Sequence, residues 1–458
     1  MTGVMAAALV LVFVNSAALV YTATALIVLF LSLNLRQFSI GTWVPVLLSV
    51  VALLMSLPRG LPAELYLQAC SRMVFLAALM AVLNTLRTAA ARAPEVARAG
   101  QFLVGQPASR RYIALTLGGH LFGVLINFGG LALLLDLATR SLKQRTDVSL
   151  PPEIQEVRLR RMTLAIMRGF GLISLWSPLG FAANVVLITL PDLTYGQFGP
   201  LGLAVSFVFV AIGWGLDRVA GWRYRQLGLP APHPPRGAWI GAVMLVAHVV
   251  VLGGSVVVLH DHSTLGFQQA LIVLVPVYAA LWTVWGVMRS AGPVAAGLGG
   301  ALRETWTRQS GTAAEVGIFA AAGFLPVILL ALLPMDVLQE AVAALGLGAV
   351  PLALMISLSV IAGAFLGVNP IVIASVMGAI ALEMDVPGLS QTAIALGIIG
   401  GWSTAIGLSP FMTTLVFCSA IVARPAWKIG PVWNGLYCLT IFAVWSVLLV
   451  TLMMTGAV

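Results

Sequence analysis

Two Ser-Pro pairs, Ser177-Pro178 and Ser409-Pro410, stand inside long apolar stretches of this chain. Proline removes a backbone donor and frees the carbonyl group one turn earlier, so a helix can break at each pair. The broken ends would then face a cavity, as in the discontinuous helices that bind ions and small ligands. An ordinary proline kink is the alternative for a single pair, but two pairs at matching places favour a binding site. The candidate oxygen donors around the breaks are Ser177, Asn184, Ser403, Thr404, Ser409 and Thr413.

Asparagine and glycine form a second set of candidate binding residues, at Asn127-Phe-Gly129 and at Gly367-Val-Asn369. Glycine permits a tight turn, and asparagine supplies a short hydrogen-bonding side chain. A helix that starts at such a turn presents free N–H groups, which favour an anionic ligand. Close helix packing is the alternative for the neighbouring glycines. Neutral oxygens also suit Na⁺, for which the candidate positions are Asn127, Ser177, Asn369 and Ser409.

Two ionisable residues, His120 and Arg168, lie in or beside the same apolar stretches. His120 could titrate, bind an anion or simply pack inside the protein. Arg168 could neutralise a carboxylate, or it could anchor a helix by reaching back to the membrane surface. The acids closest to an apolar stretch are Glu64, Asp136 and Glu315. Because these lie near the ends of the stretches, the sequence predicts no mid-membrane carboxylate, which favours a neutral or anionic cargo. It also predicts no metal centre and no cofactor apart from Na⁺ as a coupling ion.

Composition decides which elements must position these residues. Of the 458 residues, 60% are hydrophobic and only 9% are charged, which is typical of an all-α polytopic membrane protein. The formal charge of +9 comes from Lys and Arg in short loops between apolar spans, which is a topology signal. We therefore expect membrane lipids as partners and no nucleic acid.

Two apolar stretches differ from ordinary spans in their flanks. The stretch at 112–137 has Arg-rich loops on both sides, including Arg111, Arg140 and Arg145. Positive loops stay in the cytoplasm, so both ends should lie there and the stretch should be a re-entrant hairpin. The stretch at 341–382 has acidic flanks and is far longer than a single crossing of the roughly 30 Å hydrocarbon core requires, so it must fold back. Two full crossings or one hairpin would both satisfy this length.

The remaining spans divide the chain into two halves with the same count. They are expected near 4–33, 43–57, 65–83, 162–190 and 199–216, and then near 238–259, 265–288, 313–333, 390–422 and 429–454. A polar, Pro-rich segment at 217–237 would be a cytoplasmic linker between a first repeat, 1–216, and a second repeat, 238–458. Five spans per half predict inverted repeats and both termini outside. Gly119-His-Leu-Phe-Gly123 in one hairpin also parallels Gly363-Ala-Phe-Leu-Gly367 in the other.

With two inverted halves, each holding a hairpin and a broken helix, the chain resembles the ion transporter superfamily. That superfamily includes divalent-anion/sodium symporters, arsenite permeases and the large subunits of TRAP transporters. The resemblance implies a ligand between hairpin tips and breaks, a homodimer and elevator-like movement. It implies binding residues Asn127, Gly129, Ser177, Asn184, Asn369, Ser403, Thr404, Ser409 and Thr413. The Ser-Asn-Thr signature of the divalent-anion symporters is absent from these segments.

These patterns favour a secondary active transporter of a small, carboxylate-like organic anion, coupled to Na⁺ or H⁺, rather than an enzyme. We expect it in a bacterial cytoplasmic (inner) membrane. One alternative is a flippase for a lipid or polyprenyl phosphate, which could use the same hairpins. Another is a membrane-embedded enzyme acting on a lipid-linked substrate, although no paired acids are found near the spans. A structural subunit of a larger permease is a third alternative.

Overall fold

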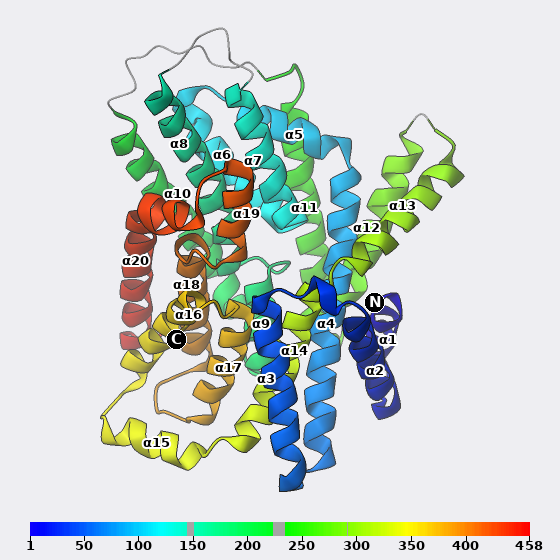
Figure 1. Cartoon of the computed structure of the whole chain (residues 1–458), viewed down its shortest axis with the longest axis vertical. Helices are drawn as coiled ribbons and strands as arrows, with labels where there is room; N and C mark the ends of the chain where they lie inside the picture. Colours follow the sequence, from blue (N-terminus) through cyan, green and yellow to red (C-terminus); the bar gives the residue numbers. More distant parts are fainter. Residues whose placement is uncertain (144–150, 223–233, 291) are drawn as a thin grey trace.

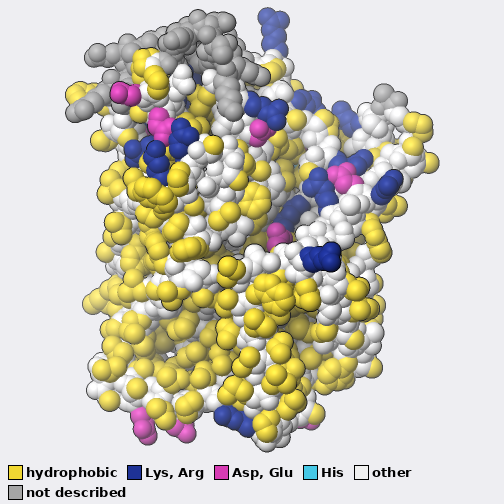
Figure 2. Space-filling view, in the orientation of Figure 1, with side chains coloured by type: hydrophobic (Ala, Val, Ile, Leu, Met, Phe, Trp, Pro, Cys, Tyr) yellow, Lys and Arg dark blue, Asp and Glu magenta, His cyan; other side chains and the backbone are white. Residues whose placement is uncertain are grey.

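The computed structural model describes residues 1–143, 151–222, 234–290 and 292–458, and the regular elements in these ranges are all helical. Eight helices in this described part are long and apolar enough to cross a membrane. Figure 2 shows a broad apolar surface over the middle and lower parts of one face, with most of its Lys and Arg side chains on the upper half. The predicted class, an all-α polytopic membrane protein, is confirmed.

The helices follow one another with short connections. The first half contains α1 (Thr2–Leu11), α2 (Ala17–Leu33), η1 (Leu35–Gln37), α3 (Ile40–Ser56), η2 (Leu57–Arg59), α4 (Ala63–Arg92), α5 (Pro94–Val104), α6 (Ala108–Ile126), α7 (Phe128–Lys143), α8 (Pro152–Gly171), η3 (Leu172–Leu175), α9 (Phe181–Thr189) and α10 (Tyr195–Ala220). The second half contains α11 (Trp239–Asp261), α12 (Phe267–Met288), α13 (Val294–Ser310), α14 (Ala313–Leu332), α15 (Met335–Ala344), α16 (Ala349–Phe365), α17 (Pro370–Glu383), α18 (Gln391–Leu408), α19 (Thr413–Val422), the π-helical η5 (Lys428–Asn434) and α20 (Gly435–Met454).

The first hairpin consists of α6 and α7, which meet at Asn127. Asn127 has φ 56° and ψ −132°, a backbone conformation that residues other than glycine rarely adopt. A side chain at Gly130 would collide with the backbone of Phe122 on the opposite helix, so the two helices approach closely just after the turn. The fold-back predicted within 112–137 is confirmed.

The second hairpin consists of α16 and α17, with Gly367 at φ 79° in the turn and Asn369 at the N-cap of α17. The two helices have 17 and 14 residues. At about 1.5 Å per residue, each is shorter than the roughly 30 Å hydrocarbon core, which favours one hairpin over two full crossings. The predicted range 341–382 is wrong at its start, because residues 341–344 belong to α15, which is bent by 118° from α16.

Both helices with an internal Ser-Pro pair are broken where the sequence predicted. After α8 and η3 the chain leaves the helix around Ser177 and resumes it in α9, and after α18 it leaves the helix at Ser409 and resumes it in α19. In Figure 1, α8 lies above α9, whereas α18 lies below α19, so the two broken helices run in opposite directions. Each broken helix follows its hairpin along the chain.

Two expected elements differ from the structure. The span at 4–33 is two helices, α1 and α2, separated by an apolar turn before Ser16, whose side chain caps α2. The count of crossings before the first hairpin therefore changes, and the argument from parity for the side of the N-terminus no longer follows. In the linker 217–237, α10 continues to Ala220, while 223–233 lie outside the described residues, as does Arg145.

The hairpins pack on the broken helices through glycine. A side chain at Gly119 of α6 would collide with the carbonyl oxygen of Ile166 on α8, and one at Gly169 of α8 would collide with that of Thr116 on α6. In the second half, a side chain at Gly401 of α18 would collide with the carbonyl oxygen of Ser357 on α16. Backbones this close can be reached only without a Cβ, so each hairpin and its broken helix form one tightly packed unit.

Candidate functional site

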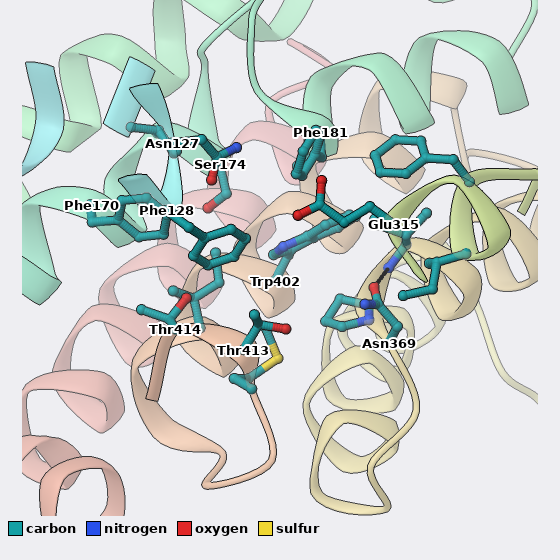
Figure 3. A pocket seen from close by; sticks show the side chains of 18 residues that line it. Asn127, Phe128, Phe170, Ser174, Phe181, Glu315, Asn369, Trp402, Thr413 and Thr414 are labelled. Atoms are coloured by element: carbon teal, nitrogen blue, oxygen red, sulfur yellow. Dashed lines mark hydrogen bonds between the residues drawn. The ribbon is translucent and has the colours of Figure 1, made fainter. Parts of the chain in front are cut away.

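A pocket of about 750 Å³, including its open mouth, lies where the two hairpin tips meet the two helix breaks (Figure 3). The tips contribute Asn127 and Phe128 from the first hairpin, and Asn369, Pro370 and Ile371 from the second. The broken helices contribute Phe170, Ile173, Ser174, Phe181 and Ala182 from the first, and Trp402, Ile406, Met412, Thr413 and Thr414 from the second. Helix α14 contributes Glu315, Ile318 and Phe319. The four segments that the sequence singled out thus surround one cavity.

Asn127, Asn369 and Thr413 are the predicted binding residues that line this pocket. Within the described chain, Oδ1 of Asn127 is buried and has no hydrogen-bond partner. Oδ1 of Asn369 instead accepts a hydrogen bond of 2.9 Å from the backbone N–H of Ile371, which caps α17. Asn127 therefore offers an unused acceptor to a ligand, whereas the acceptor of Asn369 is already engaged.

The predicted residues Ser177 and Asn184 lie behind the pocket, in the first break. Both are fully buried. Nδ2 of Asn184 donates to the carbonyl oxygens of Pro178 and Gly180, at 2.8 Å each, and so holds the irregular segment in place. Oγ of Ser177 and Oδ1 of Asn184 have no hydrogen-bond partner among the described residues. The first break thus contains unpaired oxygens that suit a cation.

The predicted residues of the second broken helix that do not line the pocket are Ser403, Thr404 and Ser409. Thr404 donates to the carbonyl oxygen of Gly400 at 3.0 Å, and Ser409 donates to that of Ala364 at 2.7 Å. The hydroxyl of Ser403 is buried without a partner in the described part of the chain. Gly129 lies in the first turn of α7, also outside the lining, and a Cβ there would contact only Ile126.

His120 has both ring nitrogens engaged. Nε2 accepts a hydrogen bond of 2.9 Å from the indole N–H of Trp176, so Nδ1 carries the proton and donates to the carbonyl oxygen of Gly169 at 3.2 Å. The imidazole also stacks on Trp176. These contacts fit the packing alternative for His120, and the ring is absent from the pocket lining.

Arg168 is 7% exposed and is not an anchor at the membrane surface, which corrects that alternative. Its Nε donates to Oδ1 of Asn434 at 2.8 Å, and Nη1 lies 3.3 Å from the hydroxyl of Tyr112. The guanidinium also lies over the ring of Tyr437. Arg168 joins α6, α8 and η5 behind the pocket, and it does not line the cavity.

Glu315 and the aromatic wall are the parts of the site that sequence reasoning missed. The sequence predicted no carboxylate at the site, yet Glu315 lines the pocket and its carboxylate points into it near Phe181 and Trp402 (Figure 3). Glu315 is the third residue of α14, so hydropathy assigned it to the end of a span. The phenylalanines were overlooked because single aromatic residues in apolar spans are common; the aromatic residues of the lining are Phe128, Phe170, Phe181, Phe319 and Trp402.

The fold is similar to the crystal structure of the YdaH transporter of Alcanivorax borkumensis, whose topology is described as unusual. The TM-score is 0.62 at 16% sequence identity, and the match covers 91% of this chain and 99% of that chain. At this identity the likeness concerns the fold alone. No protein-family model matches the sequence, and no curated protein matches it. The chain is an integral membrane protein that shares its fold with a membrane transporter.

Proposed function

We propose that the protein is a secondary active transporter that carries a small organic anion through the pocket between its hairpin tips. The observation that carries this proposal is that both tips and both breaks line one cavity. Movement of either hairpin would therefore change access to the same ligand, as alternating access requires. The volume of about 750 Å³ is in the range that holds a small molecule.

Helix N-termini support an anionic cargo. Helices α7, α9, α17 and α19 begin at Phe128, Phe181, Pro370 and Thr413, and all four of these residues line the pocket. Each helix N-terminus carries about half a positive charge and N–H groups that lack partners inside the helix. Their convergence on one apolar cavity favours a carboxylate over a cation.

Coupling to Na⁺ or H⁺ is part of the proposal, and different residues support each ion. The unpaired oxygens of Asn127, Ser177 and Asn184 are neutral, hard donors of the kind that coordinate Na⁺. Glu315 in the pocket wall could instead carry a proton. No cofactor other than the coupling ion is proposed.

The tight packing of each hairpin on its broken helix supports elevator-like movement of these units against the remaining helices. We propose membership of the ion transporter superfamily and a homodimer on the resemblance described above. We also propose a bacterial inner membrane as the location, with the C-terminus outside. The proposal for the N-terminus, also outside, awaits labelling of residues 1–16 from each side of the membrane.

Thermal unfolding of the purified protein tests the proposal first, because a bound ligand raises stability by mass action. Carboxylates, phosphate, sulfate, sulfonates and amino acids are each added with either Na⁺ or K⁺. We expect stabilisation by carboxylates. The same carboxylates are then tested for uptake into proteoliposomes under an imposed Na⁺ or H⁺ gradient, and the gradient that drives uptake identifies the coupling ion.

Stabilisation by anionic lipids alone, without any gradient-driven uptake, would contradict the proposal and favour a lipid or polyprenyl-phosphate flippase. Turnover of a lipid-linked substrate would favour the enzyme alternative.

A further inference from the structure

The pocket wall made by α14 contains an ion pair that reaches back to α4. Nη1 of Arg87 lies 3.5 Å from Oε2 of Glu315, and the guanidinium carbon of Arg87 lies 5.0 Å from the centre of the Phe181 ring. Glu315 and Phe181 both line the pocket, whereas Arg87 contacts them from behind. The side chain of Glu315 is 41% exposed and that of Arg87 is 13% exposed. The carboxylate therefore separates a buried guanidinium from the cavity.

Arg87 is poorly satisfied in this arrangement. Charge-assisted hydrogen bonds between arginine and a carboxylate are usually about 2.7–2.9 Å long, so the contact of 3.5 Å with Glu315 is weak. Nη2 of Arg87 is buried and has no hydrogen-bond partner among the residues described. A guanidinium can donate two parallel hydrogen bonds to one carboxylate, and here that capacity is largely unused.

Glu315 can be displaced without being left unstabilised. It lies in the first turn of α14, where the helix dipole favours a negative charge whether or not Arg87 is near. Its exposure means that water in the pocket can also solvate it. A second carboxylate that enters the pocket would therefore compete with Glu315 for Arg87.

We propose that Arg87 is the anion-recognition residue of this pocket and that Glu315 is its resident counter-ion, which the carboxylate of the cargo replaces. This inference rests on the proposed transport of an organic anion and names the group that receives its charge. None of the described residues that line the pocket is Lys or Arg. A second negative charge on the cargo would have no cation to meet, so the cargo class is a monocarboxylate with an apolar body.

Binding of benzoate and of its neutral isostere benzamide to the purified full chain tests the inference. Wild-type protein should bind benzoate more tightly than benzamide. Glu315→Gln should tighten benzoate binding about tenfold, because a neutral amide competes less for the guanidinium. Arg87→Gln should bring the benzoate/benzamide ratio close to one, and Arg87→Lys should give an intermediate ratio because ammonium cannot form the bidentate contact.

A second Arg–Glu pair on the same helix supplies matched controls. Arg92 of α4 pairs with Glu304 of α13 at 2.6 Å, and neither residue lines the pocket. Arg92→Gln and Glu304→Gln should leave the affinity for benzoate unchanged. If Arg87→Gln does not fold, Glu315→Gln still decides, because the inference predicts tighter binding and a site for a cationic cargo predicts weaker binding.

Three results would overturn the inference: no preference for benzoate over benzamide in the wild type, whether both bind or neither does; unchanged or weaker benzoate binding in Glu315→Gln; or equal loss in the Arg92→Gln control. Gradient-driven uptake of a carboxylate with any of these results leaves the transport proposal standing and rejects Arg87 alone. The expected binding pattern without any uptake rejects transport and keeps Arg87 as an anion site.

Discussion

The first hairpin turns through Asn127, whose side-chain oxygen is buried without a partner in the described chain, whereas the second turns through Gly367 and uses Asn369 to cap α17. Both tips contribute to the pocket. At the first tip the strained backbone and the free acceptor occur in one residue. At the second tip glycine takes the positive φ and asparagine takes the hydrogen bond, so neither is left for a ligand.

The same contrast holds along the hairpin helices. Gly119 of α6 faces the backbone of α8, but its sequence counterpart Gly363 of α16 faces the side chain of Ile373 within its own hairpin. In the second half the backbone contact is provided from α18, by Gly397 and Gly401. Similar sequence motifs thus support different contacts, and the comparison teaches that the first hairpin is the more rigidly held and the better placed to bind.

The largest expected effect comes from filling the glycine contacts. Gly119→Ala should destabilise the protein by about 3 kcal/mol or prevent folding, because two backbones would have to separate. Gly363→Ala should cost less than about 1 kcal/mol, since the side chain of Ile373 can change rotamer. Thermal unfolding of the two purified variants measures the difference.

Gly215→Ala on α10 is the matched control, because nothing lies within 4 Å of the added methyl group. It should leave stability unchanged or slightly raised, since alanine is the better helix former. Equal losses in Gly119→Ala and Gly363→Ala would remove the distinction between the hairpins.

The second effect concerns the tips. Asn127→Gly keeps the backbone conformation and removes only the amide, so the melting temperature should stay near that of the wild type while the affinity for the coupling ion or cargo falls about tenfold. Asn369→Ala should do the reverse, with a stability loss of about 1 kcal/mol from the missing N-cap and a smaller change in affinity. Unfolding and gradient-driven uptake, measured on both variants, distinguish the two roles. A loss of affinity confined to Asn369→Ala would contradict this assignment.

Much of this frame could be predicted from the sequence, because proline, glycine and charged flanks act locally. The fold-backs and both Ser-Pro breaks lie where these residues predicted them. The span at 4–33 was misjudged because its turn, around Phe13, is itself apolar and leaves no mark in hydropathy. Glu315 and Arg168 were misplaced for another reason: their surroundings are built from helices distant in sequence, such as α4 around Glu315 and η5 around Arg168.

A third, smaller effect separates the two Ser-Pro breaks. Ser409 donates a hydrogen bond of 2.7 Å to Ala364 of α16, so Ser409→Ala should cost about 1 kcal/mol of stability. Ser177 has a buried hydroxyl with no partner in the described residues, so Ser177→Ala should cost nothing or stabilise slightly. If the first break binds Na⁺, Ser177→Ala should also abolish the rise in melting temperature that Na⁺ causes in the wild type. Persistence of that rise would exclude Ser177 as a ligand.

The smallest effect lies where each broken helix begins, beside the loop that follows the other one. At the start of α8, Glu156 accepts from Arg424 at 2.6 Å and from Lys428 at 3.0 Å, whereas at the start of α18, Gln391 donates to Asp192 at 2.8 Å. The hydrogen bonds from Arg424 lower the pKa of Glu156. A carboxyl group with a lowered pKa stabilises the fold above its unfolded pKa, and this contribution disappears as the pH falls through the lowered value. Because the pair is partly exposed, Glu156→Gln should cost only about 0.5 kcal/mol at pH 7 and nothing at pH 3. Asp192→Asn keeps an acceptor for Gln391 and is the matched control, with little change in melting temperature at pH 7. A deficit in Glu156→Gln that persists at pH 3 would show that packing, rather than charge, holds this end of α8.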